Sequence, residues 1–141
     1  MENQPEGIVK FTNPQTLANP LGLYSHVSRV RCTELVFIAG QVAVDRHGAL
    51  VGAGDLVGQA RQVFANLAEA LKSESLVFAN VVKFNTYLVG AENIPKFMNA
   101  RREIFEQLYP NGKCPPNTLL VVNRLVEKEF LLEVEAIAAA W

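Results

Sequence analysis

The stretch CPPNTLLVVNRLVEKEFLLEVEAIA, residues 114–138, predicts two β-strands joined by a charged turn. Apolar runs flank the turn, and within the second run the charged residues are Glu133 and Glu135. Because successive side chains of a strand point to opposite faces, the two glutamates share a face with Leu131 and Ile137. We expect the rest of the fold to be organised around this hairpin.

The two glutamates allow two interpretations. A half-buried antiparallel strand exposes its polar side chains to water, and this is the commoner case. Leu131 and Ile137, however, put apolar side chains on the same face. A carboxylate among apolar residues must be paired, hydrogen-bonded or protonated, and is then a candidate for proton chemistry.

The composition is typical of one globular domain. Of the 141 residues, 50% are hydrophobic and 19% are charged. A chain of this length buries roughly two-thirds of its surface on folding, and the apolar excess favours further burial by self-association. We expect a single domain over residues 1–141, in which residues 1–7 form a flexible N-terminal tail.

Charge and motif content argue against several functional classes. The net charge is −1 and the 13 basic residues are scattered, whereas nucleic-acid binding requires clustered positive charge. No apolar run approaches the ~20 residues of a membrane span, and the start MENQPEG lacks the pattern of a secretory signal, so we expect a cytoplasmic protein. The spacing of Cys32, Cys114, His26 and His47 matches no metal-binding or disulfide framework, so we expect no metal.

Local signals predict the remaining strands. We expect them at residues 8–11, 27–31, 35–44 and 81–89. The strands at 27–31 and 35–44 are close enough in sequence to pair as a hairpin. Gly40 interrupts the second of these, which indicates a bulge or the close approach of another group, such as a ligand.

Two helices are expected between these strands. The first begins after Asp55 as N-cap, and its apolar residues recur on one face. These are Leu56, Ala60, Val63, Leu67 and Leu71. The second begins after Asn93, with Pro95 near its start. Its apolar side is expected to hold Ile94, Met98, Phe105 and Leu108.

The order of elements is therefore three strands, helix, strand, helix, two strands. This order predicts an α+β domain with both helices on one face of a mixed sheet. The other face is then bare, and covering it with copies of the same chain is the simplest solution.

The chain resembles the YjgF/Rid family, the reactive intermediate deaminases, from about residue 8 to residue 138. The resemblance rests on several segments in order. They are LGLYSHV (21–27), LVFIAGQV (35–42), QARQVFANLAEAL (59–71), NVVKFNTYLV (80–89), the helix containing Asn99, and LEVEAIA (132–138). Together these motifs are specific, although each alone would be weak.

The resemblance implies a chorismate-mutase-like subunit that forms a barrel-centred homotrimer with three inter-subunit clefts. In active members, the cleft hydrolyses enamines and imines to a carbonyl compound and ammonia without a cofactor. An arginine holds the substrate carboxylate in a two-pronged pair. A glutamate on the last strand activates the attacking water, and a tyrosine and backbone amides complete the site.

Transferred to this chain, these roles fall on a small set of residues. Glu133 matches the water-activating acid and Tyr24 matches the tyrosine. Glu135, which neighbours Glu133 on the same face, is expected to have a structural role. The expected ligand-binding residues are Asn117, Thr118, Leu119, Asn99, Ala39 and Gly40. No metal is implied among them.

The chain departs from the family pattern at the substrate-binding arginine, where Asn117 stands. Leu119 also occupies the place of a cysteine found in active members. An asparagine supplies no charge, and losing a bidentate ion pair should cost roughly 2–5 kcal/mol of binding, which is about two to three decades in affinity. Arg124 has the wrong strand parity to replace it.

Three functions remain open. The first is a trimeric hydrolase of imines with altered substrate choice, in which Glu133 handles water and Asn117 donates a hydrogen bond. The second is a non-catalytic trimer that binds a metabolite in its clefts. The third is the ribonuclease or translation-inhibitor activity sometimes attached to the family, which the charge balance disfavours.

Overall fold

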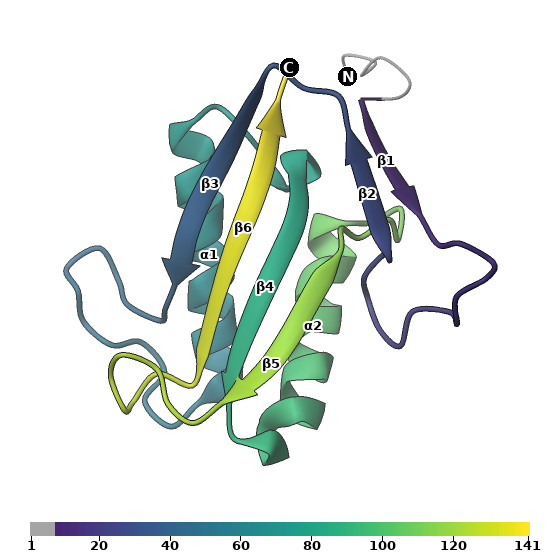
Figure 1. Cartoon of the computed structure of the whole chain (residues 1–141). Helices are drawn as coiled ribbons and strands as arrows, with labels where there is room; N and C mark the ends of the chain where they lie inside the picture. Colours follow the sequence, from purple (N-terminus) through teal and green to yellow (C-terminus); the bar gives the residue numbers. More distant parts are fainter. Residues whose placement is uncertain (1–7) are drawn as a thin grey trace.

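The computed structural model describes residues 8–141, so the expected tail at residues 1–7 lies outside the described part. A four-stranded sheet in the order β3-β6-β4-β5 forms the centre of the molecule (Figure 1). The strands are β3 (Glu34–Gln41), β4 (Val81–Val89), β5 (Asn117–Val122) and β6 (Leu132–Ala140). β6 is antiparallel to β3 and β4, whereas β5 is parallel to β4, so the sheet is mixed.

β5 and β6 do not form the hairpin that the sequence predicts, because β4 lies between them. The chain leaves the end of β4, returns through α2 (Ile94–Leu108) and re-enters the sheet in β5. A strand that returns through a helix runs parallel to the one before it. β5 therefore pairs with one edge of β4, from Asn117 opposite Phe84 onwards, and leaves the other edge to β6.

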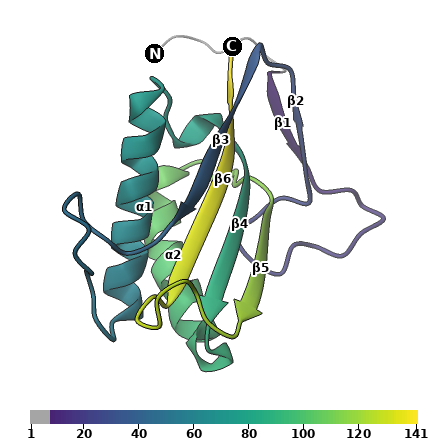
Figure 2. The ribbon, with the colours of Figure 1, turned by 60° about the vertical axis from the view of Figure 1, so that its left-hand side comes forward.

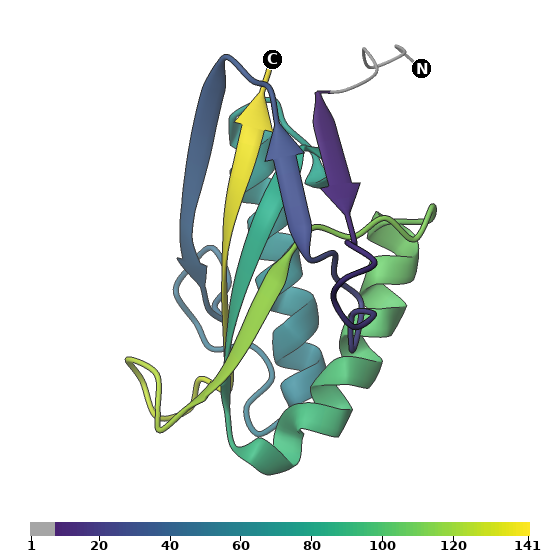
Figure 3. The same cartoon turned by 45° about the vertical axis from the view of Figure 1, so that its right-hand side comes forward.

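The expected hairpin between residues 27–31 and 35–44 is also absent. β2 (Val27–Val30) pairs antiparallel with β1 (Val9–Thr12) in a separate two-stranded sheet, while β3 pairs with β6. β2 meets the main sheet through Ser28, whose hydroxyl donates to the carbonyl of Val82 at 2.7 Å. Figure 3 shows this small sheet in front of β4 and β5.

Both helices pack on the same face of the main sheet, as expected (Figure 2). α1 (Leu56–Ser73) begins at the predicted N-cap, where the Asp55 carboxylate accepts from the amide of Gly58 at 3.1 Å. The predicted apolar stripe of α1 is buried throughout. Two short 3-10 helices, η1 (Phe78–Asn80) and η2 (Ala91–Asn93), precede β4 and α2.

The inward face of α2 differs from the prediction. Its buried residues are Phe97, Ala100, Arg101 and Phe105. Of the four apolar residues expected there, Phe105 is buried, and the other three lie at the margins with partial exposure. The helix begins after Asn93, as predicted, but the Asn93 side chain makes no capping hydrogen bond and donates instead to the carbonyl of Val89 at 2.8 Å.

The helix-covered face of the sheet contains the hydrophobic core. Aromatic rings from α1, η1, β4 and α2, together with Tyr109 just after α2, meet there with centroid separations of 5.1 to 6.4 Å. The opposite face, which we call the open face, has no helix over it (Figure 2). It exposes the side chains of Leu35, Phe37 and Leu120, and Phe37 is 71% exposed. Within residues 8–141 no helix is both long and apolar enough to cross a membrane.

Candidate functional site

The two glutamates of β6 lie on the open face, as strand alternation predicts. Leu132, Val134 and Ala136 are buried on the helix-covered side, and the glutamates between them are half-buried. Glu135 has two donors: Oε1 accepts from Asn85 Nδ2 at 3.1 Å and from the Tyr87 hydroxyl at 2.7 Å. The hydrogen bond to Glu135 raises the pKa of Tyr87, with smaller contributions from burial and from the negative charges of both glutamates.

Glu133 is placed differently, although it stands on the same strand and face. It lies opposite Tyr87 in the register, but the hydroxyl of Tyr87 bonds to Glu135. Among residues 8–141, the hydrogen bonds to carboxylates of β6 all go to Glu135. The Glu133 carboxylate therefore keeps its acceptor capacity for water or a ligand.

Gly40 makes room for the Glu133 side chain. The pairing of β3 with β6 shifts between Ile38 and Gln41, which is the predicted bulge. A Cβ atom on Gly40 would lie 2.5 Å from Glu133 Oε1, so any other residue would displace the carboxylate. The group that approaches Gly40 within the chain is thus Glu133 itself.

A cavity of about 350 Å³ hollows the open face beside Glu135. It is lined mainly by Phe37, Ala39, Asn85 and Ile137. The predicted residue Ala39 therefore borders an open hollow on the same face as the glutamates. The apolar and polar lining is of the kind that binds small molecules.

The predicted residues of β5 divide between the two faces. Asn117 points to the helix-covered side, where its Oδ1 accepts from the hydroxyl of buried Thr86 at 2.7 Å. Leu119 packs against the core from that side. Thr118 faces the open side and accepts from Lys83 Nζ at 3.1 Å. Asn117 and Glu133 therefore lie on opposite faces of one subunit.

Tyr24 and Asn99 lie on the helix side of the molecule. The Tyr24 hydroxyl accepts from the amide of Leu21 at 3.2 Å, and its ring meets the ring of His26 edge-on at 5.8 Å. Asn99 is exposed on α2, where its side-chain oxygen accepts from Arg102. Neither residue is in contact with Glu133, so a single chain does not assemble the predicted site.

A buried arginine on α2 escaped the sequence analysis. Arg101 is 3% exposed and lies among aromatic rings and close to Cys114. Its signal was present in the helical spacing, because Phe97, Arg101 and Phe105 follow one another at intervals of four. That spacing puts the arginine in the middle of the inward stripe.

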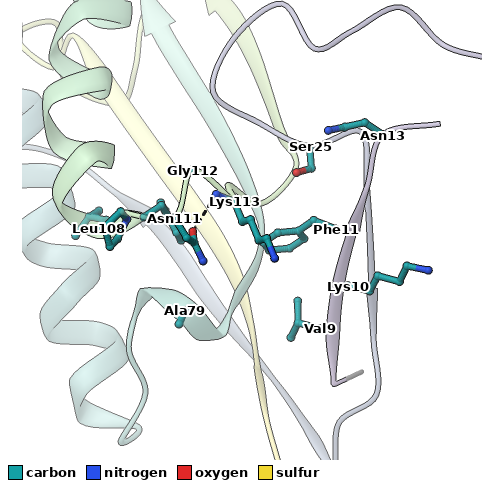
Figure 4. Close-up of a pocket in the computed structure, with 12 residues that line it drawn as sticks. Val9, Lys10, Phe11, Asn13, Ser25, Ala79, Leu108, Asn111, Gly112 and Lys113 are labelled. Atoms are coloured by element: carbon teal, nitrogen blue, oxygen red, sulfur yellow. Dashed lines mark hydrogen bonds between the residues drawn. The ribbon is translucent and has the colours of Figure 1, made fainter. Parts of the chain in front are cut away.

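A further cavity of about 550 Å³ opens between β1 and the segment after α2 (Figure 4). Lys10, Phe11, Ser25 and Lys113 are among its lining residues. None of the predicted site residues lines it. Within the described residues, no three His, Cys, Asp or Glu side chains are grouped so as to hold a metal ion.

Comparison with known proteins identifies the family. Residues 15–140 match the family model described as Endoribonuclease L-PSP. A crystal structure from Yersinia pestis, titled as a protein of unknown function of the conserved Rid family, superposes with a TM-score of 0.82. It is 32% identical in sequence, and the match covers 94% of this chain and 98% of that one. This chain belongs to the YjgF/Rid family.

Other Rid-family relatives match over most of their length. A RutC family protein of Pyrococcus horikoshii is 32% identical over 119 residues, which cover 84% of this chain and 88% of that protein. A mouse protein named 2-iminobutanoate/2-iminopropanoate deaminase is 31% identical over 118 residues, covering 84% of this chain and 82% of the mouse protein. The α+β fold expected from the sequence is confirmed by the Yersinia structure.

Proposed function

We propose that this Rid-family chain forms a homotrimer that hydrolyses a reactive imine or enamine to a carbonyl compound and ammonia. The observation that carries the proposal is the contrast between the two carboxylates of β6. Glu135 is engaged by Asn85 and Tyr87, whereas Glu133 is held against Gly40 with its oxygens free to accept from water. A half-buried carboxylate without a partner is suited to a general base.

The placement of Asn117 supports a site made from more than one copy. Asn117 and Glu133 face opposite sides of one sheet, so a cleft that contains both must take them from different subunits. The exposed apolar side chains of the open face, Leu35, Phe37 and Leu120, supply a surface for such an assembly. Some relatives, such as the mouse protein, carry the name of an imine deaminase.

The proposed chemistry balances without a cofactor. Glu133 accepts a proton from water as the water oxygen bonds to the imine carbon, and the electron pair of the C=N double bond moves to nitrogen. The proton passes to that nitrogen and completes the carbinolamine. A second proton then moves from the carbinolamine hydroxyl to nitrogen, the C=O bond forms as the C–N bond breaks, and ammonia leaves. An imine and one water therefore give a carbonyl compound and ammonia.

Asn117 shapes the substrate choice in this scheme. Its Oδ1 is occupied by Thr86, which leaves its amide hydrogens as donors. A neutral donor recognises a carbonyl or hydroxyl group but cannot neutralise a carboxylate. Asn117 is therefore expected to favour substrates that carry a neutral group at the point where it binds them.

The experiment is to generate imines in situ with an amino-acid oxidase and to measure the release of ammonia or keto acid with and without the purified protein. A panel of amino acids that includes amides and aromatic residues covers neutral and bulky substituents. Acceleration that disappears in the Glu133→Gln variant, with the oligomer intact, is the expected result. No acceleration across the panel would favour the metabolite-binding trimer instead, and an equal rate in Glu133→Gln would reject Glu133 as the base.

A further inference from the structure

The cavity of about 550 Å³ between β1 and the segment after α2 has an apolar wall (Figure 4). Val9 and Phe11 project toward it from one face of β1, and Leu108 borders it at the end of α2. Val9 and Phe11 are half-buried and lie outside the hydrophobic core. The wall that they form is therefore available to an apolar group of a ligand.

The other side of the cavity carries hydrogen-bond donors. The side chain of Lys113 extends toward Phe11 (Figure 4). Asn111 borders the cavity from the same turn, and its Oδ1 accepts from the amide of Lys113 at 2.9 Å. Because that oxygen is engaged, the NH₂ group is the part of the Asn111 side chain left for a ligand, and this group only donates. An ammonium ion and an NH₂ group together favour a ligand rich in acceptor oxygens.

The turn that carries these two side chains has a defined backbone. The amide of Gly112 donates to the carbonyl of Tyr109 at 2.9 Å, and Gly112 has a φ of +73°, in the left-handed region that favours glycine. The hydroxyl of buried Ser25 donates to the carbonyl of Cys114 at 2.6 Å, which ties the chain before β2 to the segment after α2. The walls are thus positioned without a ligand, which lowers the entropic cost of binding.

The charges around the cavity favour a dianion. Among the described residues that line it, Lys10 and Lys113 are charged and none is acidic, which gives two positive charges. Within residues 8–141 the ion pair found is that between Arg61 and Glu103, so neither lysine is paired with a carboxylate there. Lys10 projects from the other face of β1 and adds its charge at the rim (Figure 4). A phosphate monoester, with a charge of roughly −1.5 to −2 at neutral pH, matches two lysines better than a carboxylate does.

We propose that this cavity binds a small phosphate monoester with an apolar body. The phosphate lies at Lys113 and Asn111, where charge-assisted hydrogen bonds hold it. The apolar body packs between Phe11 and Leu108. This site uses no residue of the proposed hydrolytic site, so it is a second function of the subunit and does not depend on the first.

The test measures the binding of phenyl phosphate by isothermal titration calorimetry at constant ionic strength. Inorganic phosphate supplies the anion alone, benzyl alcohol supplies the apolar body alone, and phenylacetate carries the same ring on a monoanion. Wild-type protein should bind phenyl phosphate with a Kd at least about tenfold below that of each comparison probe. Failure to bind phenyl phosphate, or equal binding of inorganic phosphate or phenylacetate, would overturn the proposal.

Four variants locate the site. Lys113→Met and Asn111→Asp should each weaken the binding of phenyl phosphate at least about tenfold. In Asn111→Asp the new carboxylate still accepts from the amide of Lys113 but repels the phosphate. Phe11→Ala should weaken the binding of phenyl phosphate and leave that of inorganic phosphate unchanged. Lys128→Met, a charge-removing change at an exposed position after β5, should leave both unchanged. Binding that survives both Lys113→Met and Asn111→Asp would contradict the proposed site.

Two further readouts cover variants that do not fold and keep this site separate from the hydrolytic one. In labelled wild-type protein, the amide resonances of Gly112 and Lys113 should shift on titration with phenyl phosphate, and unmoved resonances would reject the site. Glu133→Gln should bind phenyl phosphate like wild type, so a failed hydrolysis assay leaves this result intact. Loss of phenyl phosphate binding in Glu133→Gln would place the ligand elsewhere and reject the proposal.

Discussion

The two faces of the main sheet differ in how far their charged side chains are buried and how well they are hydrogen-bonded. On the open face, two glutamates are half-buried, and one of them has two hydrogen-bond donors. On the helix-covered face, Arg101 is almost completely buried and one of its nitrogens has no acceptor. The open face places its charges where water can reach them, whereas the helix-covered face encloses one among apolar residues. We therefore assign the proposed proton chemistry to the open face.

The largest expected effect is a difference in the free energy of unfolding between two phenylalanine variants, one on each face of the sheet. Phe84 is 1% exposed in the aromatic core, and Phe84→Ala should lower the free energy of unfolding by about 3–5 kcal/mol. Phe37 is 71% exposed in the single chain. Phe37→Ala should therefore cost little within the subunit. Urea unfolding of both variants measures the difference.

Phe37 also tests the assembly of subunits. Phe37→Lys should dissociate the oligomer while each subunit remains folded, because it buries a charge in the proposed interface. Sedimentation equilibrium measures the mass, and Leu21→Lys, at a position that is 96% exposed, is the control. A trimer that persists in Phe37→Lys would place the interface elsewhere.

An intermediate effect is expected when the two glutamates are replaced, because Glu135→Ala should destabilise the fold more than Glu133→Ala. Glu135→Ala leaves Asn85 and the Tyr87 hydroxyl without their acceptor, which should cost about 1–3 kcal/mol. Glu133→Ala removes no hydrogen bond within the described chain, so we expect a change below about 0.5 kcal/mol. Thermal unfolding of the two variants side by side makes the comparison. Equal destabilisation would remove the basis for assigning them different roles.

The smallest expected effect concerns Tyr109 on the covered face. Its buried hydroxyl donates to the carbonyl of Phe78 at 3.1 Å, and burial raises its pKa above the ordinary value near 10. The folded state then holds this proton more tightly than the unfolded state, so stability is complete below pH ~10 and falls as pH rises further. Tyr109→Phe should cost about 1 kcal/mol at neutral pH and flatten the alkaline decline. Unfolding followed between pH 8 and pH 11 checks both, and an unchanged alkaline slope would assign the decline to other groups.

Periodicity predicted the local structure of this chain, but it did not predict which strands pair. The stripe of α1, the bulge at Gly40 and the shared face of Glu133 and Glu135 depend on neighbours in sequence, and all three are present. Both expected hairpins are absent. The chain returns through α2 and puts β4 between β5 and β6, while β2 pairs with β1 and β3 with β6, and sequence distance reveals neither arrangement. Arg101 was missed because an Arg-Arg pair within a helix resembles a solvated surface until the phase of Phe97 and Phe105 is considered. The partners of Asn117 and the division of the site between two faces depend on tertiary pairing in the same way.

The most direct test of the central claim is the imine-hydrolysis rate of Glu133→Gln compared with that of Glu135→Gln. Both variants replace a carboxylate with an amide on the same strand and face, so their surface charge changes equally. We predict that turnover falls at least 100-fold in Glu133→Gln and stays within a few-fold of wild type in Glu135→Gln, whose amide oxygen can still accept from Tyr87. Equal rates in the two variants, or a loss confined to Glu135→Gln, would contradict it.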